Sequence, residues 1–209
     1  MDIALVPARF GKTRLRSVLS PAQRVRLQAA MLDDVLAALR ASQVSRVVVA
    51  AGDDDVAGRA RLAGVDVVRD PARANLNAAI SHATATVAQR RDVGVLVVAA
   101  DLPTLTATEV DRLLTATRRT SVVIAPTKDG GTGALLRRPG GVIDASYGLG
   151  SAARHAELGR HASVPVLELI QPGTSLDVDH PDDLDDAAAS QALGPHTRAV
   201  LNDLAHRST

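Results

Sequence analysis

The sequence has 209 residues and a net charge of +1, and its 46% hydrophobic and 22% charged composition is ordinary for a globular domain. The near-neutral charge, a single Phe, a single Tyr and the lack of Trp exclude a broad positive field and a base-stacking platform, so we expect no nucleic-acid partner. The lack of Cys excludes disulfides and thiolate sites and favours a cytoplasmic location, and no apolar run reaches the roughly 18 residues of a membrane span, so we expect no membrane association.

Apolar, β-branched runs alternate along the chain with amphipathic patterns. We predict strands at 3–6, 46–51, 65–68, 93–99, 122–125, 133–137, 164–169 and 175–178. Capping boxes predict helices after Ser20 and Thr106, and further helices are predicted at 77–90, from Ser151, and at 196–205. The alternation predicts one α/β domain, 1–190, with a mostly parallel central sheet flanked by helices. A C-terminal helical tail, 191–209, follows as a candidate homodimer contact.

A basic loop follows the first strand. It contains Gly11-Lys12-Thr13, which matches the end of a phosphate-binding P-loop, but Val6 stands where that motif requires its first glycine. We therefore exclude a P-loop. The side chains of Arg9, Lys12, Arg14 and Arg16 suit a polyphosphate, and the alternative is an ordinary solvated basic loop.

Aspartates follow two of the predicted strands. Asp101 comes directly after the most hydrophobic strand, where ligands bind in open α/β sheets, and its carboxylate suits Mg²⁺. The alternative role for Asp101 is to cap a turn. Asp177 and Asp179 are two residues apart on a predicted strand, so both can face one cation. The four later aspartates, at 182, 183, 185 and 186, lie in the first turns of a helix and are expected to be structural.

Two glycine-rich stretches, 130–133 and 147–151, could present backbone amides to an anion, with Ser151 at the start of a helix. Ordinary turns explain them equally well. The six His residues show no metal-ligand spacing; His155 is close to Ser151 in sequence, but a single His is more often structural.

Seven motifs occur in order along the chain. They are Lys12-Thr13-Arg14-Leu15, 31–36 (MLDDVL), 76–79 (LNAA), 101–103 (DLP), 130–135 (GGTGAL), 148–155 (GLGSAARH) and 177–184 (DVDHPDDL). Together they resemble the guanylyltransferases that act on 2-phospholactate or phosphoenolpyruvate in the synthesis of the deazaflavin coenzyme F-420. The resemblance covers nearly the whole chain to about Ala189. It departs at Gly133, where members often have Asn or Ser, and at Asn75, where many have Gly.

The resemblance implies a single-domain, Rossmann-like nucleotidyltransferase fold similar to that of the molybdopterin-guanine-dinucleotide synthesis enzymes. It implies that Asp101, Asp177 and Asp179 hold Mg²⁺. The loop with Lys12 and Arg14 would hold the GTP phosphates, and these two residues and Asp101 would be catalytic. The resemblance also implies that Asn77 lies near the nucleoside. It implies that Thr132, Gly148 and Ser151 bind the small phospho-acid, largely at its carboxylate.

The reaction implied by the resemblance is transfer of GMP from GTP to 2-phospho-L-lactate or phosphoenolpyruvate, with release of pyrophosphate. A transferase for the deazaflavin precursor would then take the product. One alternative is a related nucleotidyltransferase with another phospho-acceptor, although this chain lacks the longer glycine-rich opening of those relatives. A second alternative is a non-catalytic nucleotide-binding protein on the same fold.

Overall fold

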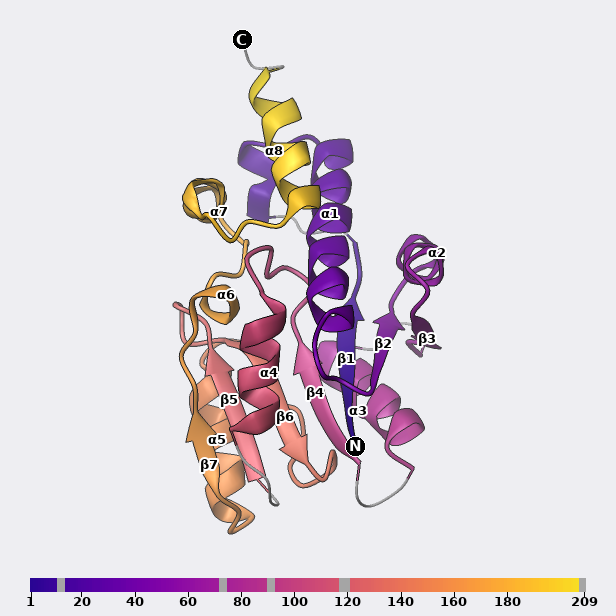
Figure 1. Ribbon diagram of the computed structural model, residues 1–209, viewed down its shortest axis with the longest axis vertical. Helices are drawn as coiled ribbons and strands as arrows, with labels where there is room; N and C mark the ends of the chain where they lie inside the picture. The colour runs from indigo at the N-terminus through magenta and orange to yellow at the C-terminus, as the bar shows by residue number, and fades with distance from the viewer. Residues whose placement is uncertain (11–13, 72–74, 90–92, 117–120, 207–209) are drawn as a thin grey trace.

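The computed structural model describes residues 1–10, 14–71, 75–89, 93–116 and 121–206. Lys12 therefore lies outside the described residues. Seven strands are described and form one sheet in the order β3-β2-β1-β4-β6-β5-β7 (Figure 1). Their bounds are β1 Asp2–Ala8, β2 Arg46–Ala51, β3 Asp66–Arg69, β4 Gly94–Val98, β5 Ser121–Pro126, β6 Thr132–Arg138 and β7 Val166–Glu168. Only β6 is antiparallel to its neighbours β4 and β5, which confirms the mostly parallel sheet.

The helices lie on both faces of this sheet. Their bounds are η1 Arg14–Ser17, α1 Pro21–Arg40, α2 Asp54–Leu62, α3 Leu76–Val87, α4 Ala107–Thr115, α5 Ser151–His161, α6 Pro172–Ser175, α7 Pro181–Ala189 and α8 Pro195–His206. The predicted capping boxes at Ser20 and Thr106 are both present. Helix α2 was not predicted, although Asp53 caps it by accepting the N–H of Val56 at 2.8 Å. Among the described residues, no helix is long and apolar enough to cross a membrane.

Strand periodicity divides the apolar side chains between the two faces of the sheet. On β1, Ala4 and Val6 join the core under α1, α2 and α4, whereas Ile3 and Leu5 join the core under α3. Strand β4 is buried at every position, as its unbroken Val/Leu sequence predicts. A third cluster, which includes Val122 and Ile124 of β5, lies under α5.

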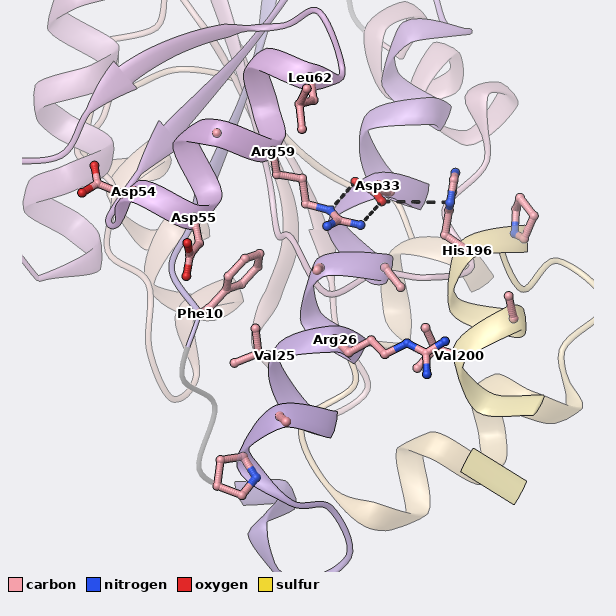
Figure 2. A pocket seen from close by; sticks show the side chains of 17 residues that line it. Phe10, Val25, Arg26, Asp33, Asp54, Asp55, Arg59, Leu62, His196 and Val200 are labelled. Atoms are coloured by element: carbon pink, nitrogen blue, oxygen red, sulfur yellow. Dashed lines mark hydrogen bonds and ion pairs between the residues drawn. The ribbon is translucent and has the colours of Figure 1, made fainter. Parts of the chain in front are cut away.

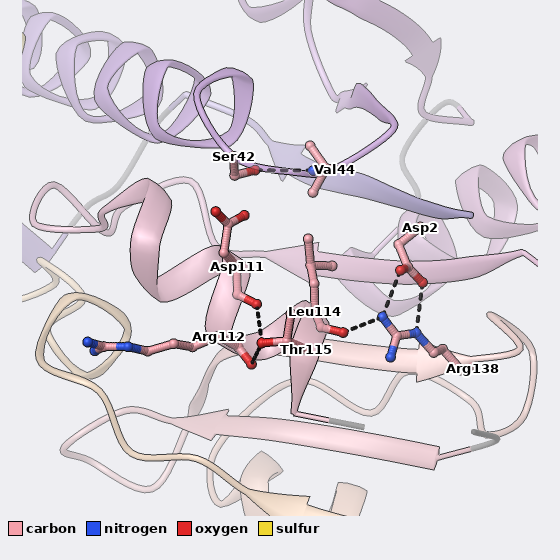
Figure 3. Close-up of polar contacts among 8 residues, drawn as sticks. All are labelled: Asp2, Ser42, Val44, Asp111, Arg112, Leu114, Thr115 and Arg138. Atoms are coloured by element: carbon pink, nitrogen blue, oxygen red, sulfur yellow. Dashed lines mark hydrogen bonds and ion pairs between the residues drawn. The ribbon is translucent and has the colours of Figure 1, made fainter. Parts of the chain in front are cut away.

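The edge of the sheet where the parallel strands begin is closed by an ion pair. Arg138, at the end of antiparallel β6, donates two hydrogen bonds to Asp2 at 2.7 and 2.8 Å and a third to the carbonyl oxygen of Leu114 (Figure 3). Both charged side chains are largely shielded from water. Because this edge is occupied by structural contacts, the opposite edge is the one available for ligands.

The C-terminal helix α8 packs on α1 (Figure 1). The buried carboxylate of Asp34, within the motif at 31–36, accepts the N–H groups of His196 at 3.0 Å and Thr197 at 2.8 Å. Asp34 therefore caps α8 from a neighbouring helix, and any side chain at Gly194 would collide with its carboxylate. The division of the chain at residue 190 stays a prediction.

One predicted strand is wrong. Residues 175–178 do not form a strand, because Pro172 begins the short helix α6 and the carbonyl oxygen of Gln171 accepts the N–H groups of Thr174 and Ser175. The segment that follows, 176–180, runs without regular secondary structure up to α7.

Candidate active site

The segment 176–180, which carries the predicted metal ligands Asp177 and Asp179, is hydrogen-bonded to the chain just after β4. The N–H of Val178 donates to the carbonyl oxygen of Asp101 at 3.1 Å. Val178 is buried, whereas Asp177 and Asp179 on either side of it are partly exposed. This backbone hydrogen bond holds the segment that carries Asp177 and Asp179 beside Asp101, which is more than 70 residues away in the sequence.

Four carboxylates, of Asp101, Asp129, Asp177 and Asp179, form what we term the acidic half of the site. Burial raises the pKa of Asp177 to about 6, and the negative charges of Asp101, Asp129 and Asp179 add to this effect. Within the described ranges, no three His, Cys, Asp or Glu side chains stand close enough to form a ready-made metal site. The carboxylates are thus near enough to repel one another but do not form a complete ligand shell.

Two cations stand beside the acidic half. Arg14 Nη1 donates to Asp179 Oδ2 at 2.6 Å, and this predicted phosphate ligand is mostly exposed. On the other side, Lys128 pairs with Asp183 at 2.6 Å. Asp183 also accepts the N–H groups of Asp179 and His180, at 2.9 and 2.7 Å, so it fixes the backbone that carries Asp179. This confirms the structural role expected for Asp183.

The hydroxyl half of the site, as we term it, consists of Thr132, Gly148, Ser151 and His155. Thr132 Oγ1 lies 2.8 Å from Ser151 Oγ and 3.1 Å from His155 Nδ1. The exposed fractions of Thr132, Ser151 and His155 are 6%, 1% and 0%. Strand β6 supplies Thr132, and the first turn of α5 supplies Ser151, preceded by Gly150 in the left-handed conformation (φ 65°).

The loop that carries Gly148 is held from two sides. Asn77, on α3, accepts the N–H of Tyr147 at 2.7 Å and donates to its carbonyl oxygen at 3.1 Å. His155 Nε2 accepts the N–H of Ser146 at 2.9 Å. Gly148 itself has φ 133°, which favours glycine, and its N–H has no acceptor among the described residues. Asn77 therefore positions this loop, and its predicted place on the nucleoside side stays a prediction.

Two adjoining cavities lie at the carboxyl ends of the strands. One, about 280 Å³, is lined by the end of β1, Leu76, Asp101 and Tyr147, among others. The second, about 260 Å³, shares Leu76 and the end of β1 and is also lined by Asp70, Ala50 and Ala79. Asp70 Oδ2 pairs with Arg9 at 2.9 Å, but its buried Oδ1 has no hydrogen-bond partner among the described residues. Such an atom is costly unless a ligand donates to it.

A larger cavity, about 1000 Å³, is lined by other described residues. It opens between α1, α2 and α8, beside the ion pair of Asp33 with Arg59 (Figure 2). None of the described residues predicted for the site lines it. Among the described residues, Phe10 alone lines both this cavity and the smaller one that contains Asp101.

Gly133 has a structural reason in this chain. A Cβ atom at this position would collide with the carbonyl oxygen of Thr174 on α6. The departure from the Asn or Ser of similar sequences therefore allows α6 to lie close against β6. Since α6 leads directly into 176–180, Gly133 helps to place Asp177.

Sequence reasoning missed Asp70 and Asp129 and left His155 undecided. The sequence places Asp70 directly after a predicted strand, as it does Asp101, and this was the available indication. Asp129 precedes a glycine stretch. The Thr127 hydroxyl, at 2.5 Å, and the Gly131 N–H hold its pKa below the usual range, and Arg14 contributes less.

Comparisons with known proteins find similar sequences over nearly the whole chain. Residues 2–205 match the family model described as "Guanylyl transferase CofC like". A phosphoenolpyruvate guanylyltransferase of Sphaerobacter thermophilus is 34% identical over 92% of this chain and 95% of its own. A 3-phospho-D-glycerate guanylyltransferase of Phenylobacterium zucineum is 37% identical (99% and 98%), and a 2-phospho-L-lactate guanylyltransferase of Methanothermobacter thermautotrophicus is 34% identical (96% and 90%).

Solved structures show the same fold. A nucleotidyl transferase from Methanothermobacter thermautotrophicus matches 97% of this chain and 99% of its own with a TM-score of 0.65 at 15% identity. A cytidylyltransferase from Leptospira borgpetersenii matches 99% and 94% with a TM-score of 0.62 at 14% identity. A glucosyl-3-phosphoglycerate synthase from Mycobacterium tuberculosis, in complex with Mn²⁺ and uridine diphosphate, matches 99% and 79% with a TM-score of 0.59 at 16% identity.

Proposed function

Because this chain belongs to the family of CofC-like guanylyl transferases, we propose that it transfers GMP from GTP to 2-phospho-L-lactate or phosphoenolpyruvate. Pyrophosphate is the second product. Relatives that cover nearly the whole chain carry the names of both acceptors, and one is named for 3-phospho-D-glycerate. All three acids combine a carboxylate with a phosphate, so the proposed acceptor class is a small phospho-acid.

The observation that supports this function most is the junction of the two halves at one edge of the sheet. The acidic half surrounds Asp101 at the end of β4, and Asp129 leads through Gly130 and Gly131 to Thr132 of the hydroxyl half. A site of this kind can hold a polyphosphate with its cation on one side and a small acid on the other. The reacting groups would then meet between the two halves.

The proposed reaction asks for little covalent chemistry from the protein. A phosphate oxygen of the acid forms a bond to the α-phosphorus of GTP, and the bond from this phosphorus to the bridging oxygen of pyrophosphate breaks. The attacking phosphate is already an anion, so no side chain has to remove a proton. Catalysis then consists of alignment and neutralisation of charge, to which Arg14 and Lys12 would contribute.

The acidic half fits a divalent cation such as Mg²⁺. Mg²⁺ is usually held by one or two carboxylates together with the phosphates of the substrate, which agrees with an incomplete ligand shell. A cation would also relieve the repulsion that raises the pKa of Asp177. We propose Asp101, Asp177 and Asp179 as its ligands. Bound there, the cation would stabilise the charge that develops on the phosphates.

The second cavity, with Asp70, is proposed to hold the guanine base. Guanine presents the N1–H and N2–H₂ donors side by side on one edge, and a carboxylate is the complementary acceptor. Asp70 Oδ1 is a buried acceptor with no partner in the part of the chain that the structure describes, and Leu76, Ala50 and Ala79 supply apolar walls. Asn77 would act from the same side through the loop at Tyr147.

The deciding experiment measures pyrophosphate release with Mg²⁺ and each of the three acids, using GTP, with ATP and CTP as controls. Release that requires GTP and one acid would support the reaction and name the acceptor. No release with any pair, from protein that still binds GTP, would contradict the proposed function.

The base assignment has its own test. The variant Asp70→Asn should lose GTP turnover and gain turnover with xanthosine triphosphate, because xanthine presents an acceptor where guanine presents the N2 amine. Unchanged preference for GTP would show that another group reads the base. A homodimer and a downstream transferase for the deazaflavin precursor remain further proposals.

A further inference from the structure

Three buried side chains form a continuous hydrogen-bonded series at the start of α5. It runs from the N–H of Ser146 to His155, from His155 to Thr132, and from Thr132 to Ser151, with distances of 2.9, 3.1 and 2.8 Å. The series links the loop before Gly148, the first residue of β6 and the first residue of α5. Each of the three elements contributes one of the proposed acceptor-binding residues, and His155 forms hydrogen bonds to both elements besides its own.

The hydrogen bonds fix the tautomer of His155. A backbone N–H can only donate, so Nε2 must accept from Ser146 and carries no proton. The proton of the neutral ring is therefore on Nδ1, which donates to Thr132 Oγ1. A charged ring would carry a proton on both nitrogens and would lose the bond to Ser146.

The surroundings keep the ring neutral. Burial, together with the nearby positive charges of Arg137 on β6 and Arg154 on α5, lowers the pKa of His155 to about 4. The ring of Tyr147 meets His155 edge-on, with ring centroids 5.1 Å apart. None of these neighbours favours a charged imidazole.

The number of donors leaves one hydroxyl proton for a ligand. Thr132 and Ser151 together have two O–H groups, and one of them is used in the bond between the two oxygens. His155 occupies an acceptor position of Thr132 and takes no hydroxyl proton, because its Nδ1 is itself the donor. Whichever way the bond between the two oxygens points, one O–H remains, and no described residue outside the series accepts it.

Two of the amides at the start of α5 are already paired. The N–H of Ser151 donates to the carbonyl oxygen of Gly148 at 3.0 Å, and that of Ala152 donates to the carbonyl oxygen of Gly130 at 3.3 Å. An ionised carboxylate accepts hydrogen bonds only, so the hydroxyl proton and the N–H of Gly148 are donors that it can use.

We propose that His155 is a positioning residue for the acceptor: through its Nδ1–H it holds Thr132 and Ser151 so that one hydroxyl donates to the carboxylate of the phospho-acid. The inference rests on the proposed function and assigns to His155 the orientation of the acceptor, with no contact to GTP. His155 takes part in no proton transfer, since the attacking phosphate needs none.

Two substitutions of His155 distinguish the hydrogen bonds of its two ring nitrogens. His155→Asn places an amide donor near the position of Nδ1 and keeps the bond to Thr132, whereas His155→Gln places its amide near Nε2 and keeps the bond to Ser146. We expect His155→Gln to raise the KM for the acceptor at least tenfold with the KM for GTP within twofold of wild type. His155→Asn should recover most of this loss. His161→Gln, an exposed change on the same helix, is the matched control.

Equal effects of the two variants, or an equal rise of both KM values, would overturn the proposal. Nuclear magnetic resonance of wild-type protein with ¹⁵N-labelled histidine keeps it testable if a variant does not fold. We expect the ring of His155 to be neutral with its proton on Nδ1, and its signal to shift when phosphoenolpyruvate is added with GTP and Mg²⁺. A proton on Nε2 of His155 would refute the inference even if wild-type turnover is normal, whereas no turnover with any acid would refute the proposed function instead.

Discussion

The acidic half and the hydroxyl half of the candidate site lie side by side but are built from opposite chemistry. The acidic half consists of partly or fully exposed carboxylates, with the exposed Arg14 beside them. Burial, with a further effect from the neighbouring carboxylates, raises the pKa of Asp177 to about 6. In the hydroxyl half, Thr132, Ser151 and His155 are buried and neutral, and Thr132 is hydrogen-bonded to both of the others.

The difference indicates which part of the site is prepared before ligands bind. The hydroxyl half is held by fixed hydrogen bonds, so it can select an acceptor by shape and donor position. The acidic half has like charges that a cation and phosphates would balance, so its final geometry depends on those ligands. Substitutions in the acidic half should therefore act on turnover, and those in the hydroxyl half on acceptor affinity.

The largest effect is expected for Asp101→Asn. It removes one negative charge at the end of β4 and should lower kcat by roughly 10²–10³-fold, because charge stabilisation supplies most of the catalysis. Pyrophosphate release measures the loss, and a thermal melt close to wild type would show that the fold is intact. Asp185→Asn, at an exposed site on α7, is the control with the same charge change. Near-normal turnover of Asp101→Asn would show that the charge of Asp101 is not needed for catalysis.

Ser151→Ala should act on the acceptor. Loss of a hydrogen bond to a charged group corresponds to about tenfold or more in the acceptor KM. The KM for GTP should stay near wild type in the same pyrophosphate assay. Ser81→Ala, exposed on α3, serves as the control. An equal rise of both KM values would show that Ser151 does not act specifically on the acceptor.

Gly133→Ser tests the contact that joins β6 to α6. The new Cβ would collide with the carbonyl oxygen of Thr174 and displace the segment that leads to Asp177. We expect a loss of about 1–3 kcal/mol in the free energy of unfolding, as for other overpacked sites, and a lower kcat. Gly141→Ser, where a Cβ meets open space, is the control. Full stability and turnover would show that α6 can move freely.

The free energy of unfolding should depend on pH through His155. Its pKa is about 4 in the folded protein and near 6.5 in an unfolded chain, so the unfolded state binds a proton first as the pH falls. The contribution of His155 to stability is therefore lost between about pH 6.5 and 4, by about 2 kcal/mol at pH 5. The raised pKa of Asp177 acts in the opposite direction in both proteins, so urea unfolding at pH 7 and 5 should show a loss about 2 kcal/mol greater in wild type than in His155→Gln. Equal losses of stability in wild type and in His155→Gln would mean that another group titrates.

The smallest effect is expected for Arg14→Gln. Its ion pair with Asp179 is exposed, so the free energy of unfolding should change by less than about 1 kcal/mol. A rise of a few-fold in the KM for GTP would place Arg14 on the phosphates. Arg61→Gln, exposed on α2, controls for the change of charge. A larger effect on the KM for the acceptor than on the KM for GTP would indicate that Arg14 acts on the acceptor instead.

Local patterns predicted most of the fold. The Val/Leu run before Asp101 identified β4, and the capping boxes at Ser20 and Thr106 gave the starts of α1 and α4. Prediction failed at 175–178, where alternating residues indicated a strand but Pro172 and the Gln171 carbonyl oxygen begin a short helix. It also missed α2, whose short helix depends on the Asp53 cap and on packing against β2 and β3.

By itself, the sequence determined the α/β layers, the family and the position of Asp101 at a strand end, because periodicity, capping and motif order act between residues that are near in the chain. Only the tertiary structure decided which distant groups meet. The bond from Val178 to Asp101, the Asp34 cap on α8 and the tautomer of His155 each depend on strand order and on the path of loops. Contacts of this kind join residues from 9 to more than 160 positions apart and leave no periodic trace in the sequence.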